Sequence, residues 1–332
     1  MRKLLLILVL VFINACSSSE VKELIDIADG VERKPIDVSR LGLNSFANDS
    51  RFGSISKQFL TVRDTLGIKR IRILFNWDNN VQPTPGSNPD FSFYDNLASN
   101  IPSGVNALVV LTGIPGWMSD SSNWIDGNPR KTFVELWVKK VIKRYSSNGQ
   151  LLAFQIWNEP NQAREENTRM SLRDSPENYV EMLAMAHTAI KDVNSDKMVL
   201  NASTTAINQS FPETLDYNKA MVEAGALSFV DIYAFHYYGR LFERMRDIRG
   251  FLNSLDTTLW VTESGIQGVN EQLAYGEQVW PFLRENLNNL DLIFIYQHTE
   301  ATSPESTFGL ENLDPELPVS DLRVHLVERA GS

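Results

Sequence analysis

Apolar residues gather in eight short runs along the chain after residue 40, and polar, helix-like stretches separate the runs. Continuous apolar runs of this length are typical of strands that are covered on both faces, as in a parallel sheet. We therefore predict strands at residues 41–46, 68–75, 106–112, 151–157, 197–203, 230–236, 258–263 and 290–296.

The stretches between the runs have the spacing of amphipathic helices. In the segment TFVELWVKKVIKRYSSNG, apolar residues recur at every fourth position and a glycine follows as a stop: Phe133, Trp137, Val141, Tyr145 and Gly149. This spacing places the apolar side chains on one face of a helix. The segments 177–193 and 218–225 repeat the pattern, so helices are expected there too.

A closed (β/α)8 barrel needs eight strands that alternate with helices, and this pattern fills about 290 residues here. A doubly wound open sheet is the alternative, but no glycine-rich phosphate fingerprint follows the first predicted strand. The sequence predicts the α/β class, with a single (β/α)8 TIM barrel over residues 39–332.

The first residues have the pattern of an export signal. A basic head, Met1 to Lys3, precedes the apolar stretch LLLILVLVFI, which is too short for a typical spanning helix. The chain's one cysteine, Cys16, follows in INAC, which resembles the bacterial lipobox. The alternative is an ordinary secretory signal. We predict a signal peptide at 1–15, a lipidated Cys16 with a tether at 16–38, and a lipoprotein held at the outer membrane, facing the periplasm or the cell surface.

Composition narrows the classes of partner. The 332 residues carry a net charge of −10, with a pI of about 5.0. A nucleic-acid partner is not expected, because phosphate binding needs a basic face. With 4 histidines and one cysteine, a metal site built from clustered ligands is not expected either, and no cofactor is predicted.

Polar residues follow several of the predicted strands, which in a barrel is where catalytic groups gather. Glu159 ends the fourth run in WNEPN, and Glu263 ends the seventh in TESG. These strands face each other across the mouth of an eight-stranded barrel. Two carboxyl groups about 5–5.5 Å apart are suited to glycoside hydrolysis with retention of configuration. The pair is therefore a candidate catalytic centre.

Six segments, in the same order along the chain, resemble the strand signatures of glycoside hydrolase clan A, the retaining (β/α)8 enzymes. They are IRILFNW, TGIPGW, WNEPN, FVDIYAFHYYG, LWVTESG and FGLENLDPELPVSDLRVHL. The similarity covers nearly all of the chain after residue 40 and is greatest to families 39 and 5. It implies a glycosidase that cleaves β-linked poly- or oligosaccharides.

The resemblance also implies roles for the two carboxylates and a neighbour. Glu159 would be the acid/base, Glu263 the nucleophile, and Asn158 would hold the 2-hydroxyl of the sugar. An acid/base needs a raised pKa, which partial burial and the charge of Glu263 would supply to Glu159.

Three further residues are implied near the nucleophile. Tyr238 would touch Glu263 with His236 beside it, and Arg72 would lie beneath Glu263 and favour its charged form. The alternatives are that Arg72 is a structural ion-pair partner and that His236 is a core histidine.

Aromatic residues are candidates for sugar-stacking platforms, because the apolar faces of sugars pack on rings. We predict Trp117 and Trp77 in this role, and Trp157 in the wall of the site. Related enzymes usually have a tryptophan at the end of the eighth strand, where this chain has Tyr296. Tyr296 is therefore expected at the floor of the sugar site.

Other functions are compatible with these residues. A transglycosylase uses the same pair, and a carbohydrate-binding lipoprotein on an inactive barrel is the alternative outside enzymes. An inverting enzyme would need Asp78 or Glu300 as its base at a wider spacing. The sequence leaves the sugar, the linkage and the oligomeric state open.

Overall fold

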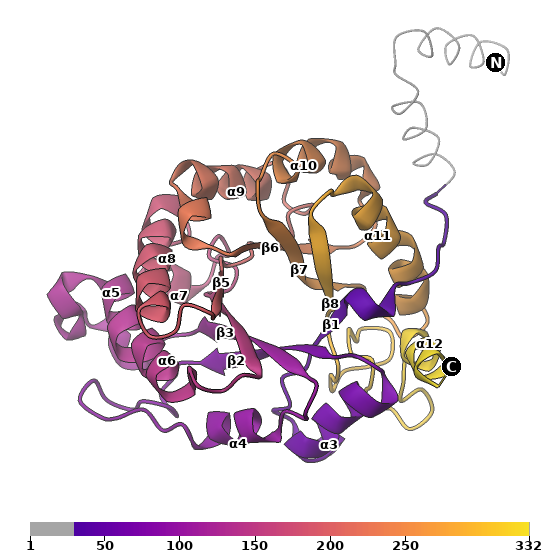
Figure 1. Ribbon diagram of the computed structural model, residues 1–332, viewed down its shortest axis with the longest axis horizontal. Helices are drawn as coiled ribbons and strands as arrows, with labels where there is room; N and C mark the ends of the chain where they lie inside the picture. Colours follow the sequence, from indigo (N-terminus) through magenta and orange to yellow (C-terminus); the bar gives the residue numbers. More distant parts are fainter. Residues whose placement is uncertain (1–29, 332) are drawn as a thin grey trace, which may run out of the picture.

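The computed structural model describes residues 30–331, which form one closed barrel of eight parallel strands. The strands pair in sequence order, and β8 closes the ring on β1 (Figure 1). Every predicted strand is present, although the fifth is short. They are β1 (Leu41–Asn44), β2 (Arg70–Asn76), β3 (Asn106–Thr112), β4 (Leu151–Ile156), β5 (Met198–Leu200), β6 (Ile232–Tyr238), β7 (Thr258–Gly265) and β8 (Leu290–Ile295). The predicted (β/α)8 barrel is confirmed.

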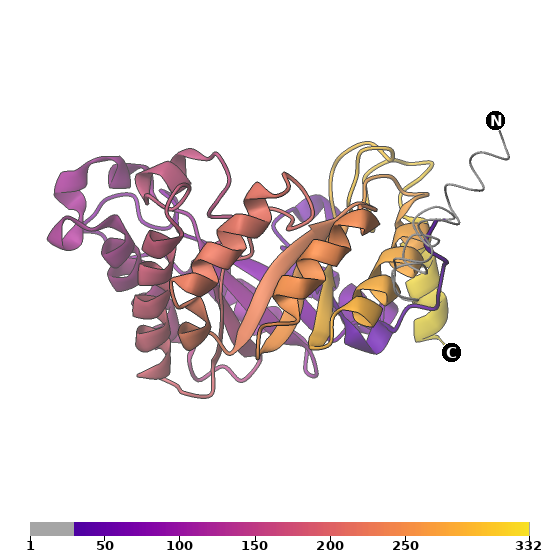
Figure 2. The same cartoon turned by 90° about the horizontal axis from the view of Figure 1, so that it is seen from above.

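Helices surround the barrel, and Figure 2 shows them leaning against the strands from outside. They are α3 (Ile55–Leu60), α4 (Ser92–Asn100), α5 (Pro129–Phe133), α6 (Lys139–Tyr145), α7 (Glu165–Arg169), α8 (Pro176–Lys191), α9 (Glu213–Glu223), α10 (Met245–Leu252), α11 (Gln272–Asn286) and α12 (Asp321–Ala330). A π-helical turn, Val134–Val138, joins α5 to α6. The three predicted helices therefore correspond to α5–α6, α8 and α9.

The inside of the barrel changes from apolar to polar along the strands. Its apolar part is a cluster of inward-facing side chains: Leu108, Ala153, Leu200, Ile232, Ala234, Trp260, Leu292 and Phe294. Gly42 makes room for Phe294, since a Cβ there would lie 2.4 Å from the ring. Nearer the carboxyl ends, the buried side chains are polar, and they include Asn44, Arg72 and Gln155. The interior thus provides a buried, hydrogen-bonding base for the mouth.

The packed domain begins before residue 39, where the sequence placed its boundary. Val31 and Ile36 are buried, the Lys34 amide donates to the Glu277 carbonyl at 2.9 Å, and Gln278 Nε2 donates to the Val31 carbonyl at 2.9 Å. Residues 31–36 therefore belong to the domain through α11, because their apolar side chains have a partner surface. The predicted signal peptide and Cys16 lie outside the described residues.

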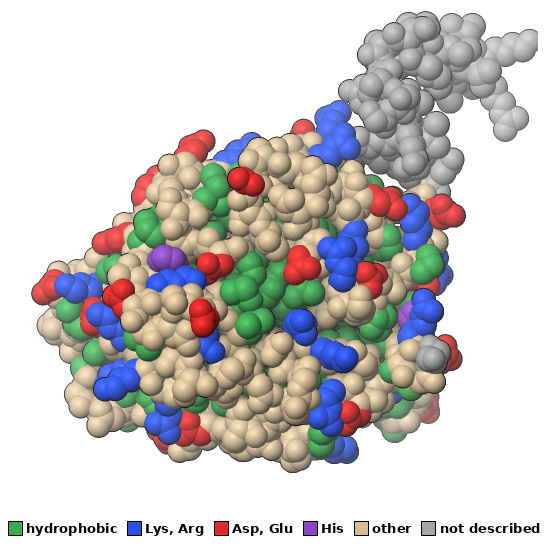
Figure 3. All heavy atoms as spheres, in the orientation of Figure 1, with side chains coloured by type: hydrophobic (Ala, Val, Ile, Leu, Met, Phe, Trp, Pro, Cys, Tyr) green, Lys and Arg blue, Asp and Glu red, His purple; other side chains and the backbone are tan. Residues whose placement is uncertain are grey.

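The molecular surface mixes both signs of charge. Figure 3 shows acidic and basic side chains interspersed over the face seen in Figure 1, with apolar side chains gathered near its centre. Among the helices of residues 30–331, none combines the length and the apolar character that crossing a membrane would require.

Candidate active site

Glu159 is held at the mouth of the barrel by an unusual stretch of backbone after β4. Trp157 and Glu159 both have positive φ angles, of 74° and 48°, which are uncommon for residues with a side chain. Two hydrogen bonds fix the turn: the Glu159 amide donates to the Ser203 carbonyl at 2.8 Å, and Asn167 Nδ2 donates to the Glu159 carbonyl at 2.8 Å. The turn brings a carboxylate that follows a buried strand into contact with His236 of β6, at 3.3 Å.

Glu263 lies within β7, close to its carboxyl end. The pairing between β6 and β7 shifts register at this point, so that His236 becomes the neighbour of Glu263. Such irregularities re-aim side chains and are common next to active sites. Glu263 is buried, with 7% of its surface exposed, and it faces Glu159 across the mouth.

Arg72 lies beneath Glu263 and has no exposed surface. Its guanidinium donates four hydrogen bonds: Nη1 to Glu263 Oε1 at 2.6 Å, Nη1 to Asn44 Oδ1 at 2.8 Å, Nε to Gln155 Oε1 at 3.0 Å and Nη2 to Asn158 Oδ1 at 2.7 Å. A buried arginine with its donors satisfied in this way favours a charged carboxylate beside it. The structure places Arg72 beneath Glu263, as the sequence predicted, and brings Asn158 to the same guanidinium.

Tyr238 contacts the other oxygen of the same carboxylate. Its hydroxyl donates to Glu263 Oε2 at 2.8 Å. Burial, and then the charge of Glu263, raise the pKa of Tyr238 well above its usual range, so the phenol stays protonated and remains a donor. Glu263 is thus held from two sides by groups that stabilise its negative charge.

His236 is buried between the two carboxylates. Its Nδ1 lies 3.3 Å from Glu159 Oε1, and its Nε2 lies 3.5 Å from Glu263 Oε1. Because the imidazole contacts both partners of the pair, His236 belongs to the site and is not a separate core histidine.

The three side chains converge closely. One ligand atom from each of Glu159, His236 and Glu263 lies within 4.8 Å of the other two. Such a group could hold a metal ion, but Arg72 already places a positive charge 2.6 Å from Glu263. The arrangement is therefore better suited to reactions carried by the carboxylates themselves.

The pKa of Glu159 differs from the sequence prediction. Burial raises the pKa of Glu159, but the hydrogen bond and charge of His236 and the charges of Arg164 and Arg72 together outweigh it, so the pKa lies below its ordinary value. The expectation of a raised pKa is wrong for the unliganded site. Sequence reasoning considered Glu263 as the neighbour of this carboxyl group and missed Arg164, whose Nη2 lies 3.3 Å from Glu159 Oε2.

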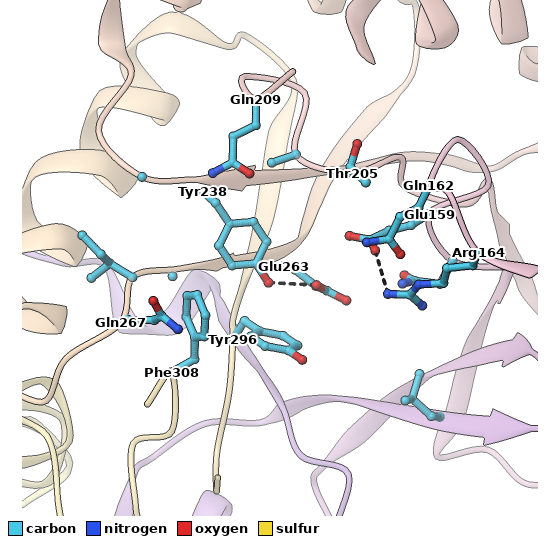
Figure 4. Close-up of a pocket in the computed structure, with 16 residues that line it drawn as sticks. Glu159, Gln162, Arg164, Thr205, Gln209, Tyr238, Glu263, Gln267, Tyr296 and Phe308 are labelled. Carbon is cyan, nitrogen blue, oxygen red and sulfur yellow. Dashed lines mark hydrogen bonds and ion pairs between the residues drawn. The ribbon is translucent and has the colours of Figure 1, made fainter. Parts of the chain in front are cut away.

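A cavity of about 720 Å³ opens above the pair, and Figure 4 shows its two unlike sides. Tyr238, Tyr296 and Phe308 stand on one side, and Glu159, Gln162 and Arg164 on the other. The cavity is lined by Leu74, Asn158, Glu159, Gln162, Arg164, Thr205, Ala206, Gln209, Tyr238, Gly239, Glu263, Gly265, Ile266, Gln267, Tyr296 and Phe308.

Tyr296 lines the cavity, at the position predicted for a sugar floor. Its ring packs edge-on against Tyr238 and Phe308, with centroids 5.9 and 5.7 Å apart. Phe308 was not predicted, because it comes from the long loop after β8. That loop returns to the strand end through two backbone hydrogen bonds between residues 297 and 308 and between 310 and 297.

Trp77 and Trp117 are not sugar platforms in this structure. Trp77 has no exposed surface, and its ring stacks on Trp137 with centroids 6.4 Å apart. Trp117 packs edge-on against Trp77, and its Nε1 donates to the Gln82 carbonyl at 2.9 Å. Neither residue lines the cavity. Trp77 follows β2 and packs into the helix layer, and Trp117 follows β3 and packs on Trp77. Trp157, predicted in the wall, is buried behind the cavity lining.

Asp78 and Glu300, the bases considered for an inverting reaction, are engaged elsewhere. Asp78 Oδ1 accepts hydrogen bonds from the amides of residues 80 and 81, and Glu300 Oε2 accepts one from the Phe308 amide at 2.6 Å. Neither carboxylate lines the cavity. Both stabilise loops, which leaves Glu159 and Glu263 as the carboxylates that face each other there.

Solved structures of glycoside hydrolases share this fold. A family 39 glycoside hydrolase from the gut symbiont Bacteroides cellulosilyticus WH2 has a TM-score of 0.62 at 18% identity over 90% of this chain and 64% of its own. The family 39 enzyme from Xanthomonas axonopodis pv. citri has a TM-score of 0.64 at 15% identity, over 92% of this chain and 68% of its own. A monomeric β-xylosidase from Caulobacter crescentus CB15 has a TM-score of 0.62 at 16% identity, over 90% of this chain and 69% of its own.

These likenesses show the fold, and the chain spans about two thirds of the length of the three proteins. No curated protein matches the sequence. The sequence profile of the family Cellulase (glycosyl hydrolase family 5) matches residues 32–294, which is most of the chain and includes both candidate carboxylates. The chain therefore belongs to glycosyl hydrolase family 5, a clan A family, and is a glycoside hydrolase.

Proposed function

We propose that the protein hydrolyses β-glycosidic bonds in a poly- or oligosaccharide by double displacement, with Glu159 as acid/base and Glu263 as nucleophile. The observation that carries the proposal is the approach of the two carboxylates, which have oxygens within 4.8 Å of each other. Retaining enzymes keep their carboxyl groups about 5–5.5 Å apart, whereas inverting enzymes keep them about 6.5–9.5 Å apart to admit a water.

The unlike surroundings of the two carboxylates support the division of roles. Glu263 accepts hydrogen bonds from Arg72 at 2.6 Å and from the Tyr238 hydroxyl at 2.8 Å, and both orient its oxygens as a nucleophile requires. Glu159 contacts the imidazole of His236 and the half-exposed Arg164, and it lines the cavity with 13% of its side chain exposed. It can therefore exchange a proton with substrate and with water.

The proposed reaction has two steps. First, Glu159 gives its proton to the glycosidic oxygen while Glu263 attacks the anomeric carbon, which releases the leaving group and forms a covalent glycosyl–enzyme ester. Next, Glu159 takes a proton from a water molecule, whose oxygen attacks the same carbon and frees Glu263. Asn158, fixed by its hydrogen bond to Arg72, would hold the sugar 2-hydroxyl through both steps.

Tyr296 and Phe308 provide the apolar surface of the proposed glycone site. Their rings line the cavity beside Tyr238, on the side of Glu263. Apolar faces of sugars pack on such rings. The glycone would therefore sit on the aromatic side of the cavity and the leaving group on the side of Glu159.

A substrate screen tests the proposal. The purified chain is incubated with β-linked glucans, mannans, xylans and galactans, and with the matching aryl glycosides, beside Glu159→Gln as a matched control. We expect cleavage by the wild type with release of the β-anomer first, measured by NMR. Release of the α-anomer first would refute retention. Equal binding without cleavage in both proteins would favour a carbohydrate-binding function.

Azide rescue assigns the two roles. Glu263→Ala should lose turnover and regain part of it with azide, forming the inverted α-glycosyl azide. Glu159→Ala with an activated aryl glycoside should instead give the β-glycosyl azide, since the covalent intermediate still forms. Full activity of Glu263→Ala without azide would refute its role as nucleophile.

We also propose that the chain is exported and anchored through a lipid on Cys16, at the outer membrane. The resemblance of INAC to a lipobox, at the position of the chain's one cysteine, supports this. Cys16→Ser should move the protein from the detergent phase to the aqueous phase in Triton X-114 partition and should abolish incorporation of labelled palmitate. Unchanged partition of Cys16→Ser would contradict the anchor.

A further inference from the structure

The cavity carries a cation whose role the hydrolytic reaction does not explain. Arg164 lines the cavity beside Glu159, and 52% of its side chain is exposed. Among residues 30–331, its guanidinium has one hydrogen-bond partner, Glu159 Oε2, at a long 3.3 Å and through Nη2 alone. An arginine offers five N–H donors in a planar fork, so most of this donor capacity is unused among residues 30–331.

The acids nearest in sequence do not compete for this side chain. Glu165 pairs with Arg169 one turn along α7, and Glu166 is exposed to solvent. The backbone of Arg164 is fixed by its amide, which donates to the Gln162 carbonyl at 2.8 Å. The guanidinium therefore points into the cavity from an anchored position (Figure 4).

The position of Arg164 defines which part of a substrate it would meet. An acid/base carboxyl must lie beside the glycosidic oxygen, because it gives its proton to that atom. The aromatic side of the cavity, with Tyr296 and Phe308, lies beside Glu263 and suits the glycone. Arg164 stands beyond Glu159, on the opposite side. The group that leaves after the first step therefore passes against Arg164.

We propose that Arg164 recognises an anionic substituent, a carboxylate or a sulfate, on the leaving-group sugar. This proposal rests on the proposed function of the same site. Arginine binds planar carboxylates with two parallel hydrogen bonds, and such charge-assisted bonds are shorter and stronger than neutral ones. The substrate would then be an acidic β-glycan, such as one with uronic acid residues next to the cleaved bond.

The net charge of the chain limits the density of charge on this substrate. At −10, the protein repels a polymer that is anionic at every residue. Among the side chains that line the cavity, Arg164 is the one basic residue, and Glu159 and Glu263 are acidic. A single arginine matches a single anionic group, so the fit is to a glycan with spaced acid groups.

An anion on the substrate would also favour the protonated form of Glu159. Four groups face this carboxyl: Arg164, His236, Arg72 and, across the mouth, Glu263. The three basic groups lower the pKa of Glu159, which disfavours the protonated acid that the first step needs. A substrate carboxylate that pairs with Arg164 offsets one of these positive charges. The correct substrate would thereby raise the pKa of its own acid catalyst.

Three leaving groups of matched size test the proposal on the full chain. Aryl β-glycosides of glucose, xylose, mannose and galactose are prepared with 3-carboxyphenyl, 3-carbamoylphenyl and 3-sulfophenyl leaving groups. The kcat/KM of each is measured for wild type, Arg164→Gln and Arg164→Lys. We expect the kcat/KM of the carboxylate to be roughly tenfold that of the carboxamide in wild type, a ratio limited by solvent exposure. In Arg164→Gln the two values should be about equal. Comparing this ratio between proteins cancels the intrinsic reactivity of the leaving groups.

Arg164→Lys keeps the charge without the fork, so it should retain part of the preference. A preference for the sulfonate alone would identify sulfate as the anion, and one for the carboxylate would identify a uronic acid. A ratio that is the same in wild type and Arg164→Gln would overturn the proposal. So would an equal loss on every leaving group, because Arg164 would then be a positioning residue for Glu159.

Binding separates this proposal from the proposed function. The glycosides of one sugar with these three leaving groups are titrated calorimetrically into Glu263→Gln, alone and combined with Arg164→Gln. Tighter binding of the anionic glycosides, lost in the double variant, supports Arg164 even if no glycoside is cleaved. Equal binding of all three contradicts the proposal even if hydrolysis is observed. Thermal unfolding of each variant confirms that it is folded.

Discussion

The buried guanidinium of Arg72 is the group whose removal should have the largest effect on the domain. Replacing it with methionine keeps most of the side-chain length but removes four hydrogen bonds and the charge beside Glu263. Glu263 then remains as a buried carboxylate without its counter-ion. Breaking a buried pair in this way costs about 3–5 kcal/mol, because one charge is left uncompensated.

This magnitude corresponds to a lowering of Tm by of order 10 °C, at roughly 2–4 °C per kcal/mol for large single domains. Differential scanning calorimetry at neutral pH measures the change directly. Arg72→Lys, which keeps the charge but not the fork, should fall between wild type and Arg72→Met. We also expect kcat to fall in both variants, since Asn158 and Glu263 lose the group that orients them.

A double variant separates the lost ion pair from the lost packing. In Arg72→Met with Glu263→Gln, the uncompensated charge is gone, and we expect about half of the lost stability to return. If the double variant unfolds no higher than Arg72→Met, the loss comes from the cavity and the unpaired amides, and the electrostatic reasoning is refuted. Glu263→Gln alone is the reference for the second half of the cycle.

Three other predictions concern the site. Tyr238→Phe removes the 2.8 Å hydrogen bond to Glu263, so kcat should fall roughly 10–100-fold with a smaller change in KM, and an unchanged kcat would contradict its role. His236→Gln should raise the pKa of Glu159, because the hydrogen bond and the charge of His236 both lower that pKa and help to outweigh the opposite effect of burial. Since the protonated acid is the active form, the basic limb of the kcat/KM profile should move to higher pH, and a shift to lower pH would be inconsistent with this balance. Tyr296→Ala should raise KM several-fold whereas Trp117→Ala should leave it nearly unchanged, because Tyr296 alone of the two lines the cavity, and steady-state kinetics on one glycoside compares them.

The fold and the centre of the site could be predicted from the strands alone. The apolar runs predict the fold, and the residues at the carboxyl ends of the strands predict the site. Apolar runs mark the barrel, and a closed barrel brings the carboxyl ends of its strands to one mouth. Glu263, Arg72 and Tyr238 lie within β7, β2 and β6, and their contacts follow from that geometry. Glu159 follows β4 by a few residues and is carried with it.

The rim could not be predicted, because loop paths depend on distant contacts. Phe308 and Arg164 reach the cavity through loops that local sequence patterns do not describe. Trp77 follows β2 directly and could have faced the mouth, but stacking on Trp137 drew it into the helix layer. The pKa of Glu159 depended on the balance between burial and three basic neighbours, and the sequence did not place those neighbours beside it.

The left-handed turn that presents Glu159 implies a trade between activity and stability. Positive φ angles at Trp157 and Glu159 cost of order 1 kcal/mol each or more, and the rest of the domain maintains them. Glycine adopts such angles without strain. Glu159→Gly should therefore give a protein that does not cleave unactivated glycosides and yet is at least as resistant to unfolding as the wild type. The backbone geometry that presents the acid/base would then lower the stability of the folded hydrolase.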